Sequence, residues 1–216
     1  MNDLDKTLYA IDGINPDKLY IQYEGGNEHI WSTTNKWTLS LWNKNDVKLK
    51  GNHIIDQVEQ LERELSEDII NGTNKAVTPK ALICTDNIIT NIGLTESAKR
   101  DTGEVSTTLT HNSIGTGTTT PTVSNTDLAT EDTGGSYARQ AYASAGQRKV
   151  SNQTAKYGML WDDGDVSGVP ISITESGVHW HASNASSMHA RVTFTAFSMT
   201  TGDLFVTQIN ELHQNG

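Results

Sequence analysis

The chain has one cysteine, few basic residues and no long apolar run, and each shortage excludes a class of protein. With Cys84 alone among 216 residues, an intrachain disulfide and a thiolate metal cluster are excluded. Lys and Arg number 16 against 26 Asp and Glu, for a net charge of -10. Nucleic-acid binding is not expected, because phosphate contacts need clustered basic side chains. No apolar run approaches the ~20 residues of a membrane helix.

The N-terminal stretch MNDLDKTLYAIDGINPD is acidic and mixed, unlike a secretory signal. We therefore expect a chain made in the cytoplasm, or assembled into something from there, with no membrane partner. No sequence pattern predicts a cofactor.

Residues 52–72 carry the one clear helix pattern. Asn52 can cap the start, and Asn71-Gly72 has the form of a helix end. The apolar residues Ile54, Val58, Leu61 and Leu65 are spaced by four, three and four, which makes a narrow heptad seam. Two interpretations stay open. The four residues are candidates for an oligomer interface in a coiled coil, or they pack an amphipathic helix onto its own domain.

Short strand patterns fill most of the remaining sequence. Two precede the helix, KLYIQY (18–23) and KWTLSLW (36–42); in the second, Trp37, Leu39 and Leu41 alternate with other residues. Seven follow it, at 81–95, 105–114, 137–144, 154–161, 170–180, 190–199 and 203–212. Turn residues separate them, and no helix alternates with them. This pattern predicts a mainly β chain with an antiparallel β-sandwich at about 80–213, and argues against a nucleotide-binding βαβ fold.

The patterns divide the chain into three parts. We expect an N-terminal docking region with short strands at 1–50, a helix and linker at 51–78, and the β-sandwich domain at 79–216.

The stretch HNSIGTGTTTPTVSNTDLATED (111–132) invites a functional interpretation. Its alternating glycines, Gly115 and Gly117, resemble a phosphate-binding loop, but such a loop needs a following helix and usually a lysine. Here the glycines are followed by Pro121 and by Ser, Thr and Asn residues that can bond their own backbone in turns. The stretch therefore predicts a long, ordered connection between two strands.

Metal ligands are sparse. His179 and His181 flank Trp180 and would share a face of a strand, so that three such pairs in a trimer could ligate a metal; surface histidines are the alternative. The acidic stretch WDDGDVSG (161–168) lacks the spacing of a calcium loop and indicates a turn. No motif pairs a nucleophile with a base, so we expect no enzymatic activity, and a hydrolase on a β scaffold is the least favoured alternative.

Two segments together resemble structural proteins of tailed bacteriophages and prophages. The first, IGTGTTTPTVSNTDLATE (114–131), is similar to a strand that ends in a G-T-G-T/S-x-x-P turn followed by D-T-x-L-x-x-E. The second, at 171–212, is similar to I-x-E-x-G, a variable loop, A-R-x-x-F and a G-D-x-L-x-V strand. The positions that carry the match include Gly115, Gly117, Pro121, Glu175, Gly177 and Arg191. His179 departs from the pattern, which commonly has an apolar residue there.

The resemblance implies a β-sandwich assembly module without catalysis, located in a virion. We expect an oligomeric component of a tail, baseplate or fibre, with a trimer favoured and other virion proteins as partners. The alternatives are a capsid decoration or head-fibre protein, and a carbohydrate- or receptor-binding module in which tryptophans stack on a glycan on the host surface.

Glu175 and Arg191 lie on neighbouring predicted strands. We expect either a cross-strand ion pair that fixes the register of the hairpin or two independent surface charges.

Overall fold

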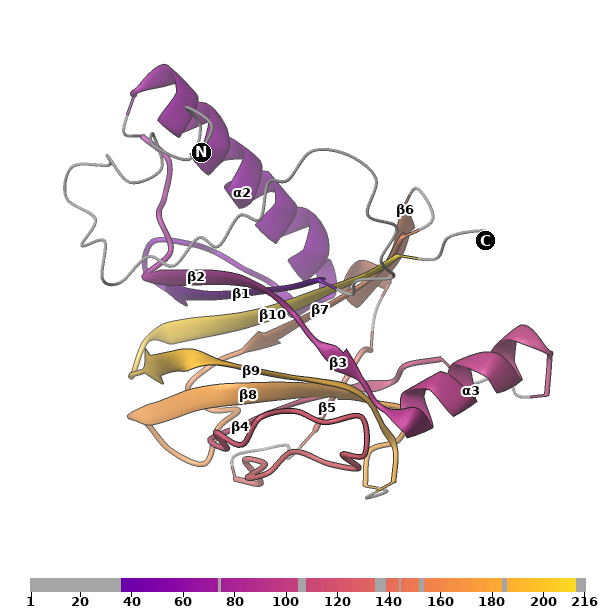
Figure 1. The fold of residues 1–216 in the computed structure, drawn as a ribbon. Helices are drawn as coiled ribbons and strands as arrows, with labels where there is room; N and C mark the ends of the chain where they lie inside the picture. Colours follow the sequence, from indigo (N-terminus) through magenta and orange to yellow (C-terminus); the bar gives the residue numbers. More distant parts are fainter. Residues whose placement is uncertain are drawn as a thin grey trace. The chain divides into compact units, whose positions relative to one another are not determined.

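The computed structural model describes residues 36–73, 75–104, 108–134, 139–143, 145–151, 154–183 and 186–212. The described residues form strands in two sheets and the α-helices α2 and α3 (Figure 1). Each sheet has five strands, in the orders β2-β1-β10-β7-β6 and β3-β9-β8-β4-β5. The chain is therefore mainly β, and two antiparallel five-stranded sheets fit the predicted β-sandwich class. The predicted strand KLYIQY lies outside the described residues.

The chain forms two compact units, and both draw on distant parts of the sequence. Unit 1 comprises 1–84, 144–160 and 202–216, and unit 2 comprises 85–143 and 161–201. These boundaries differ from the expected division at 50 and 78. The difference arises because β1 (Lys36–Asn43) pairs antiparallel with β10 (Asp203–Leu212), from Lys36 opposite Asn210 to Asn43 opposite Asp203.

Unit 1 contains the first sheet and the predicted helix. The other strands of this sheet are β2 (Ala81–Asp86), which continues to the unit boundary, β6 (Arg148–Ser151) and β7 (Thr154–Trp161). The helix α2 (Ile54–Asn71) follows a short 3-10 helix, η1 (Gly51–His53), so Asn52 lies within η1 and not at the start of α2. A second 3-10 helix, η2 (Ala145–Gln147), precedes β6. The predicted C-terminal glycine is confirmed, since Gly72 has φ +63°.

The apolar seam of α2 packs into the core of its own unit. Ile54 and Val58 are fully buried with Trp42 and Val206, and Leu61 packs against this cluster. Leu65 is also buried. Gly158 on β7 allows the close approach, because a Cβ there would lie 2.8 Å from Ile55 Cγ1. The candidate oligomer interface is therefore core, and the alternative of a helix packed on its own domain holds.

Both faces of the first sheet are buried at β1. Trp37, Leu39 and Leu41 form one buried face, as the alternation predicts. Ser40 and Trp42 on the opposite face are buried as well, and the Trp42 indole Nε1 donates to Ser40 Oγ at 2.7 Å. The period of two is thus present, but Trp42 is covered because α2 packs on that face.

Unit 2 contains the second sheet. Three longer strands form its centre: β4 (His111–Gly115), β8 (Ile171–His179) and β9 (Met188–Met199). Two-residue strands form its edges, β3 (Ile88–Ile89) and β5 (Gln140–Ala141). The strands predicted at 170–180 and 190–199 are confirmed within one or two residues, whereas the described part of the pattern at 137–144, residues 139–143, contains β5 alone.

The prediction of one strand over 81–95 is wrong. After β2 and β3 the chain turns into a second helix, α3 (Asn91–Asp101). Thr90 starts it, because its hydroxyl accepts from Gly93 N at 2.9 Å and donates to Met188 O on β9. Gly93 lets the helix meet β9, since a Cβ there would lie 2.2 Å from His189 O. The apolar run by itself is typical of a strand, but the N-cap at Thr90 and the close packing at Gly93 favour a helix.

Candidate functional site

One face of the second sheet is polar and yet buried. The register places Ser113 of β4 opposite Gly177 of β8, and Gly177 opposite Arg191 of β9. Glu175 and His179 point to the same face, being two residues away along β8. All these side chains are at most 1% exposed. Such a face needs a partner that supplies hydrogen bonds, because buried polar groups without them are destabilising.

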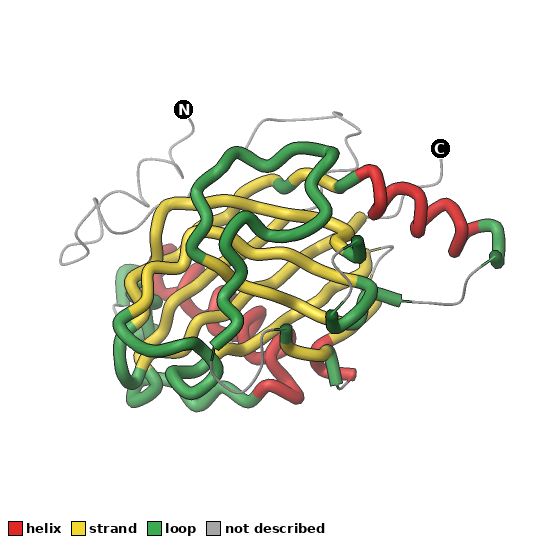
Figure 2. The backbone as a smooth tube through the Cα atoms, turned by 90° about the horizontal axis from the view of Figure 1, so that it is seen from below, coloured by secondary structure: helices red, strands yellow, loops and turns green. Residues whose placement is uncertain are grey.

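The loop between β4 and β5 supplies that partner. The two ends of the loop are hydrogen-bonded together beside β4. Thr116 N donates to Thr130 O, and Asp132 N donates to Ile114 O on β4, both at 2.9 Å. Leu128 is buried against the sheet, and the nearest atom to a Cβ at Gly177 would be Leu128 Cδ2. Figure 2 shows a long loop crossing in front of the strands on this side. The prediction of an ordered connection is confirmed.

Glu175 binds the loop through backbone amides. Its Oε1 accepts from Gly117 N at 2.9 Å and from Thr130 N at 2.7 Å, and its Oε2 accepts from Ala129 N at 3.0 Å. Three backbone donors thus converge on one carboxylate from two distant parts of the loop. This carboxylate closes the loop on itself and ties it to β8.

Arg191 completes the first anchor. Its Nη2 lies 2.8 Å from Glu175 Oε2. The same guanidinium also donates to the loop, from Nη1 to Asn125 Oδ1 at 2.9 Å and from Nη2 to Thr119 O at 3.0 Å. The expected cross-strand ion pair is therefore present. It is diagonal, since Arg191 lies opposite Gly177, and it is fully buried, which excludes the alternative of independent surface charges.

The two glycines of the loop are required by this anchor. A Cβ on Gly115 would lie 2.4 Å from Thr130 O, and one on Gly117 would lie 2.3 Å from Glu175 Oε1. Neither distance is possible for a real side chain, so the glycines bring backbone against carboxylate. Pro121, the other predicted motif residue, is half-buried.

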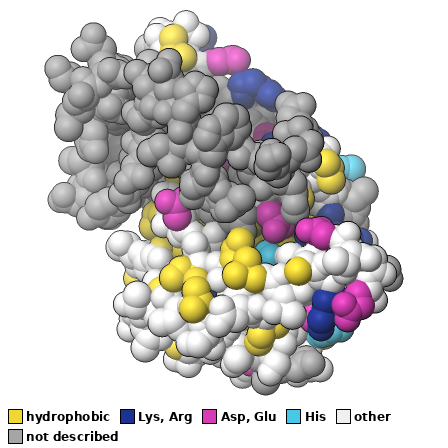
Figure 3. All heavy atoms as spheres, turned by 45° about the vertical axis from the view of Figure 1, so that its right-hand side comes forward, with side chains coloured by type: hydrophobic (Ala, Val, Ile, Leu, Met, Phe, Trp, Pro, Cys, Tyr) yellow, Lys and Arg dark blue, Asp and Glu magenta, His cyan; other side chains and the backbone are white. Residues whose placement is uncertain are grey.

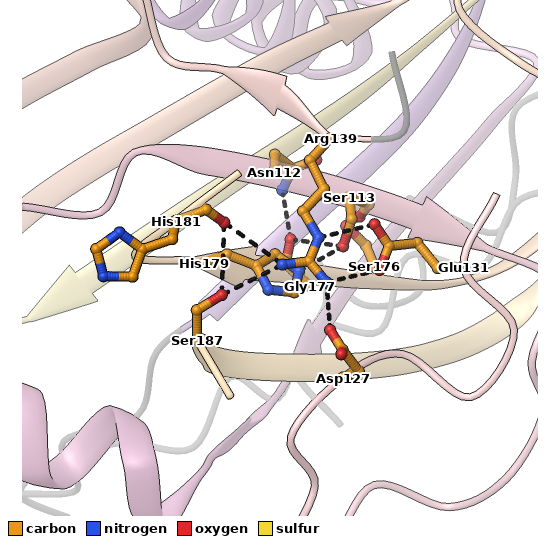
Figure 4. A network of polar contacts seen from close by, with 10 residues as sticks. All are labelled: Asn112, Ser113, Asp127, Glu131, Arg139, Ser176, Gly177, His179, His181 and Ser187. Carbon is orange, nitrogen blue, oxygen red and sulfur yellow. Dashed lines mark hydrogen bonds and ion pairs between the residues drawn. The ribbon is translucent and has the colours of Figure 1, made fainter. Parts of the chain in front are cut away.

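Arg139, just before β5, forms a second anchor (Figure 4). Its Nε donates to Glu131 at 2.8 Å and its Nη2 also binds Asp127 of the loop. On the other side Nη1 donates to Ser187 Oγ at 3.2 Å and to His181 O at 3.4 Å. The guanidinium therefore joins the loop to the turn between β8 and β9.

His179 lies beneath this second anchor. Its Nε2 lies 2.7 Å from Ser113 Oγ, and its Nδ1 is buried with no hydrogen-bond partner among the described residues. Burial, with Arg139 and His111 adding to it, holds the pKa of His179 well below its usual range. The imidazole is therefore neutral at pH 7.

The predicted histidine pair does not form. His179 is fully buried, whereas His181 is exposed in the turn after β8. The departure from the resemblance pattern at His179 is thus a buried polar side chain bonded to Ser113. The acidic stretch is a turn, as predicted, because Asp162 Oδ1 accepts from Gly164 N at 2.8 Å and Asp165 Oδ2 accepts from Asp162 N at 2.9 Å.

Sequence reasoning missed Asp127, Glu131, Arg139 and Ser113. The first two stand at the ends of the stretch DLATE (127–131), so their four-residue spacing was available as a signal. Arg139 carried none, because it lies in an alternating stretch that was interpreted as strand. Ser113 reaches His179 only through the pairing of β4 with β8.

Compared with protein-family models, with curated proteins and with solved structures, the chain has no match.

Proposed function

We propose that the chain is a non-enzymatic structural protein of a tailed-virus particle, an oligomeric component of its tail, baseplate or fibre. One observation carries the proposal. The two sequence segments that resemble phage structural proteins are separated by residues 132–170, and their Gly117, Glu175 and Arg191 meet in one buried network. Residues of the resemblance pattern thus have a structural role in common, which is to fix a loop on a sheet.

The mechanism is presentation of a rigid, uncharged surface. The loop exposes hydroxyl-bearing and small side chains at Thr116, Thr118, Thr119, Thr120, Thr122, Val123, Ser124 and Thr126. On the face drawn in Figure 3 the described surface is mostly uncharged, and its acidic and basic side chains are few and in places adjoin one another. Because two arginines hold the loop, binding another protein of the particle requires little further ordering.

Self-association uses a surface other than the seam of α2. That seam is occupied by the core of its own unit, so the coiled-coil argument for a trimer is lost. A trimer is still the proposed state, and its remaining basis is the resemblance of the β module to fibre-proximal parts of tailed bacteriophages. No helix among the described residues is long and apolar enough to cross a bilayer.

The capsid decoration or head-fibre alternative uses the same surface and differs only in location. The carbohydrate-binding alternative needs exposed tryptophans, and the described residues contain none. Trp37, Trp42, Trp161 and Trp180 are at most 2% exposed and offer no face for stacking, and Trp31 lies outside the described residues.

A hydrolase would need access to its nucleophile. Ser113 and His179 form a hydrogen-bonded pair of the kind hydrolases use, but both side chains are 0% exposed. A substrate does not reach Ser113 Oγ in this arrangement.

Immunogold labelling of virus particles produced by the source of the gene tests the location. Antibody against the chain is expected on the tail or baseplate; label confined to the capsid would favour the decoration alternative, and unlabelled particles would contradict both.

Light scattering of the purified full chain tests assembly. The expected mass is three times the 23.6 kDa of one chain, and a monomer at every concentration would contradict self-association outside the particle.

A further inference from the structure

Beneath Arg139, three metal-ligating side chains from separate parts of unit 2 converge. One carboxylate oxygen each of Asp127 and Glu131 and one ring nitrogen of His179 lie within 4.8 Å of one another. Carboxylate oxygens and imidazole nitrogens are both zinc ligands, and a site with three protein ligands leaves a fourth position for water. Mg²⁺ and Ca²⁺ fit less well, because they prefer oxygen ligands alone.

The contacts of Ser113 are compatible with the His179 tautomer that a metal site needs. Ser113 Oγ lies 2.7 Å from His179 Nε2 and 3.5 Å from Gly177 O, so the hydroxyl can accept from Nε2–H while it faces Gly177 O. Nδ1 is then unprotonated, and it is the buried nitrogen without a partner among the described residues. Metal-ligating histidines have this arrangement, in which one nitrogen donates to a neighbouring oxygen and the other faces the ion. A neutral imidazole is also the form that binds metal.

The cation between the carboxylates in this structure is the Arg139 guanidinium. It satisfies Asp127 and Glu131 but makes no hydrogen bond to His179 Nδ1 among those found. Its Nη1 bonds to Ser187 Oγ and His181 O do not involve the carboxylates. If an ion displaces the guanidinium from the two carboxylates, Arg139 can therefore keep its hydrogen bonds to Ser187 and His181. Asp127 is 29% exposed and offers the route from solvent.

From these contacts we propose that Asp127, Glu131 and His179 form a binding site for a divalent transition metal of the zinc class, in competition with Arg139. The site links the loop to the end of β8, so an ion bound there fastens the same loop that Arg139 holds. Its partner groups are two carboxylate oxygens and His179 Nδ1, with Ser113 orienting the imidazole.

Titration calorimetry of the full chain with ZnCl₂ at pH 7.5 tests the proposal. We expect one Zn²⁺ per chain, binding at least tenfold weaker in Asp127→Asn, and about 10- to 100-fold weaker in Ser113→Ala because an outer-shell partner is lost. Because Asn and Asp have the same size and position 127 is partly exposed, we expect the Asp127→Asn variant to fold as the unmodified chain does. Arg139→Gln should bind more tightly, since a competing cation is removed.

His181→Gln is the matched control, because His181 is exposed in the adjacent turn and is not a ligand. It should bind as the unmodified chain does. Equal binding by the unmodified chain and Asp127→Asn would overturn the site, as would loss of binding in His181→Gln. Binding by Arg139→Gln alone would also overturn it, because Arg139 would then be a permanent counter-ion in the native chain.

Discussion

At the residue scale, Glu175 joins two distant parts of the loop to β8. Its two oxygens accept three backbone N–H groups and face Arg191, which uses the acceptor capacity of a carboxylate fully. A buried ion pair of this kind adds little net stability compared with apolar side chains of the same size. What it adds is geometry, since only one path of the loop brings all its donors to Glu175.

Removing one partner of this pair should be strongly destabilising. Arg191→Ala leaves the Glu175 carboxylate buried without its cation, and we expect a loss of about 3–5 kcal/mol in the free energy of unfolding. Urea unfolding followed by circular dichroism measures it.

Lys99→Ala is the control for that prediction. It breaks the partly exposed ion pair between Lys99 and Glu96, which lie one turn apart on α3, and should change stability far less than Arg191→Ala does, because solvent screens an exposed pair. Equal effects of the two substitutions would show that the buried pair does not hold the loop.

Gly117 should tolerate no side chain. In Gly117→Ala the new Cβ would lie 2.3 Å from Glu175 Oε1 and 2.7 Å from Ala129 Cβ, so either the loop or the carboxylate has to move. We expect a loss of about 1–3 kcal/mol, the usual range for overpacking, measured by thermal or urea unfolding. Gly51→Ala provides the comparison, because the nearest atom to its Cβ is 3.9 Å away; a loss there as large as at Gly117 would refute the contact.

At the element scale, α2 carries a carboxyl group in a costly position. Burial, and after it the neighbouring Glu59, raises the pKa of Glu62 to about 7 against the opposing effect of Lys156. The native chain therefore keeps this proton up to about pH 7, whereas the unfolded chain releases it near 4.5. Because the native state binds more protons in this window, stability falls as pH rises through it, by about 3 kcal/mol in all.

Glu62→Gln should remove this dependence. Above pH 7 the variant should be more stable than the unmodified chain by up to about 3 kcal/mol, and the difference should vanish below about pH 4.5. Urea unfolding between pH 4 and pH 8.5 gives the curve. Glu67→Gln, an exposed position on the same helix, should leave it almost unchanged; a pH-independent difference for Glu62→Gln would contradict the raised pKa.

The two helices show which elements local sequence can predict. The pattern at 52–72 is long, periodic and ended by glycine, and the structure follows it within two residues. The pattern at 81–95 is a short apolar run, which periodicity alone cannot assign. Its division into β2, β3 and α3 depends on Thr90 and Gly93 meeting β9, a strand about a hundred residues later.

At the scale of the whole molecule, the N-terminal strand β1 is indispensable to the first sheet. It lies between β2 and β10, so the region expected to fold independently, 79–216, lacks a central strand. A fragment of residues 78–216 lacks β1 and α2 but keeps the second sheet, so it should unfold with a smaller enthalpy than 36–216, which retains every described element. Differential scanning calorimetry measures both, and equal enthalpies would show that β1 is not needed.

The sequence by itself determined the mainly β class, the position of α2, most of the strands of the second half, and the ordered nature of the loop at 111–132. These features depend on periodicity, turn residues and the absence of a lysine and helix after the glycines, all of which act locally. It also indicated the Glu175–Arg191 pair, because both residues lie on adjacent strands of one hairpin.

Only the tertiary structure decided where the faces of these elements are directed. The apolar seam of α2 suits a second helix or a sheet equally well, and the choice depends on Trp42 and Val206 being beside it. Arg139, Asp127 and His179 come together because β4 pairs with both β5 and β8. Contacts between residues so far apart along the chain depend on strand pairing, which no local pattern encodes.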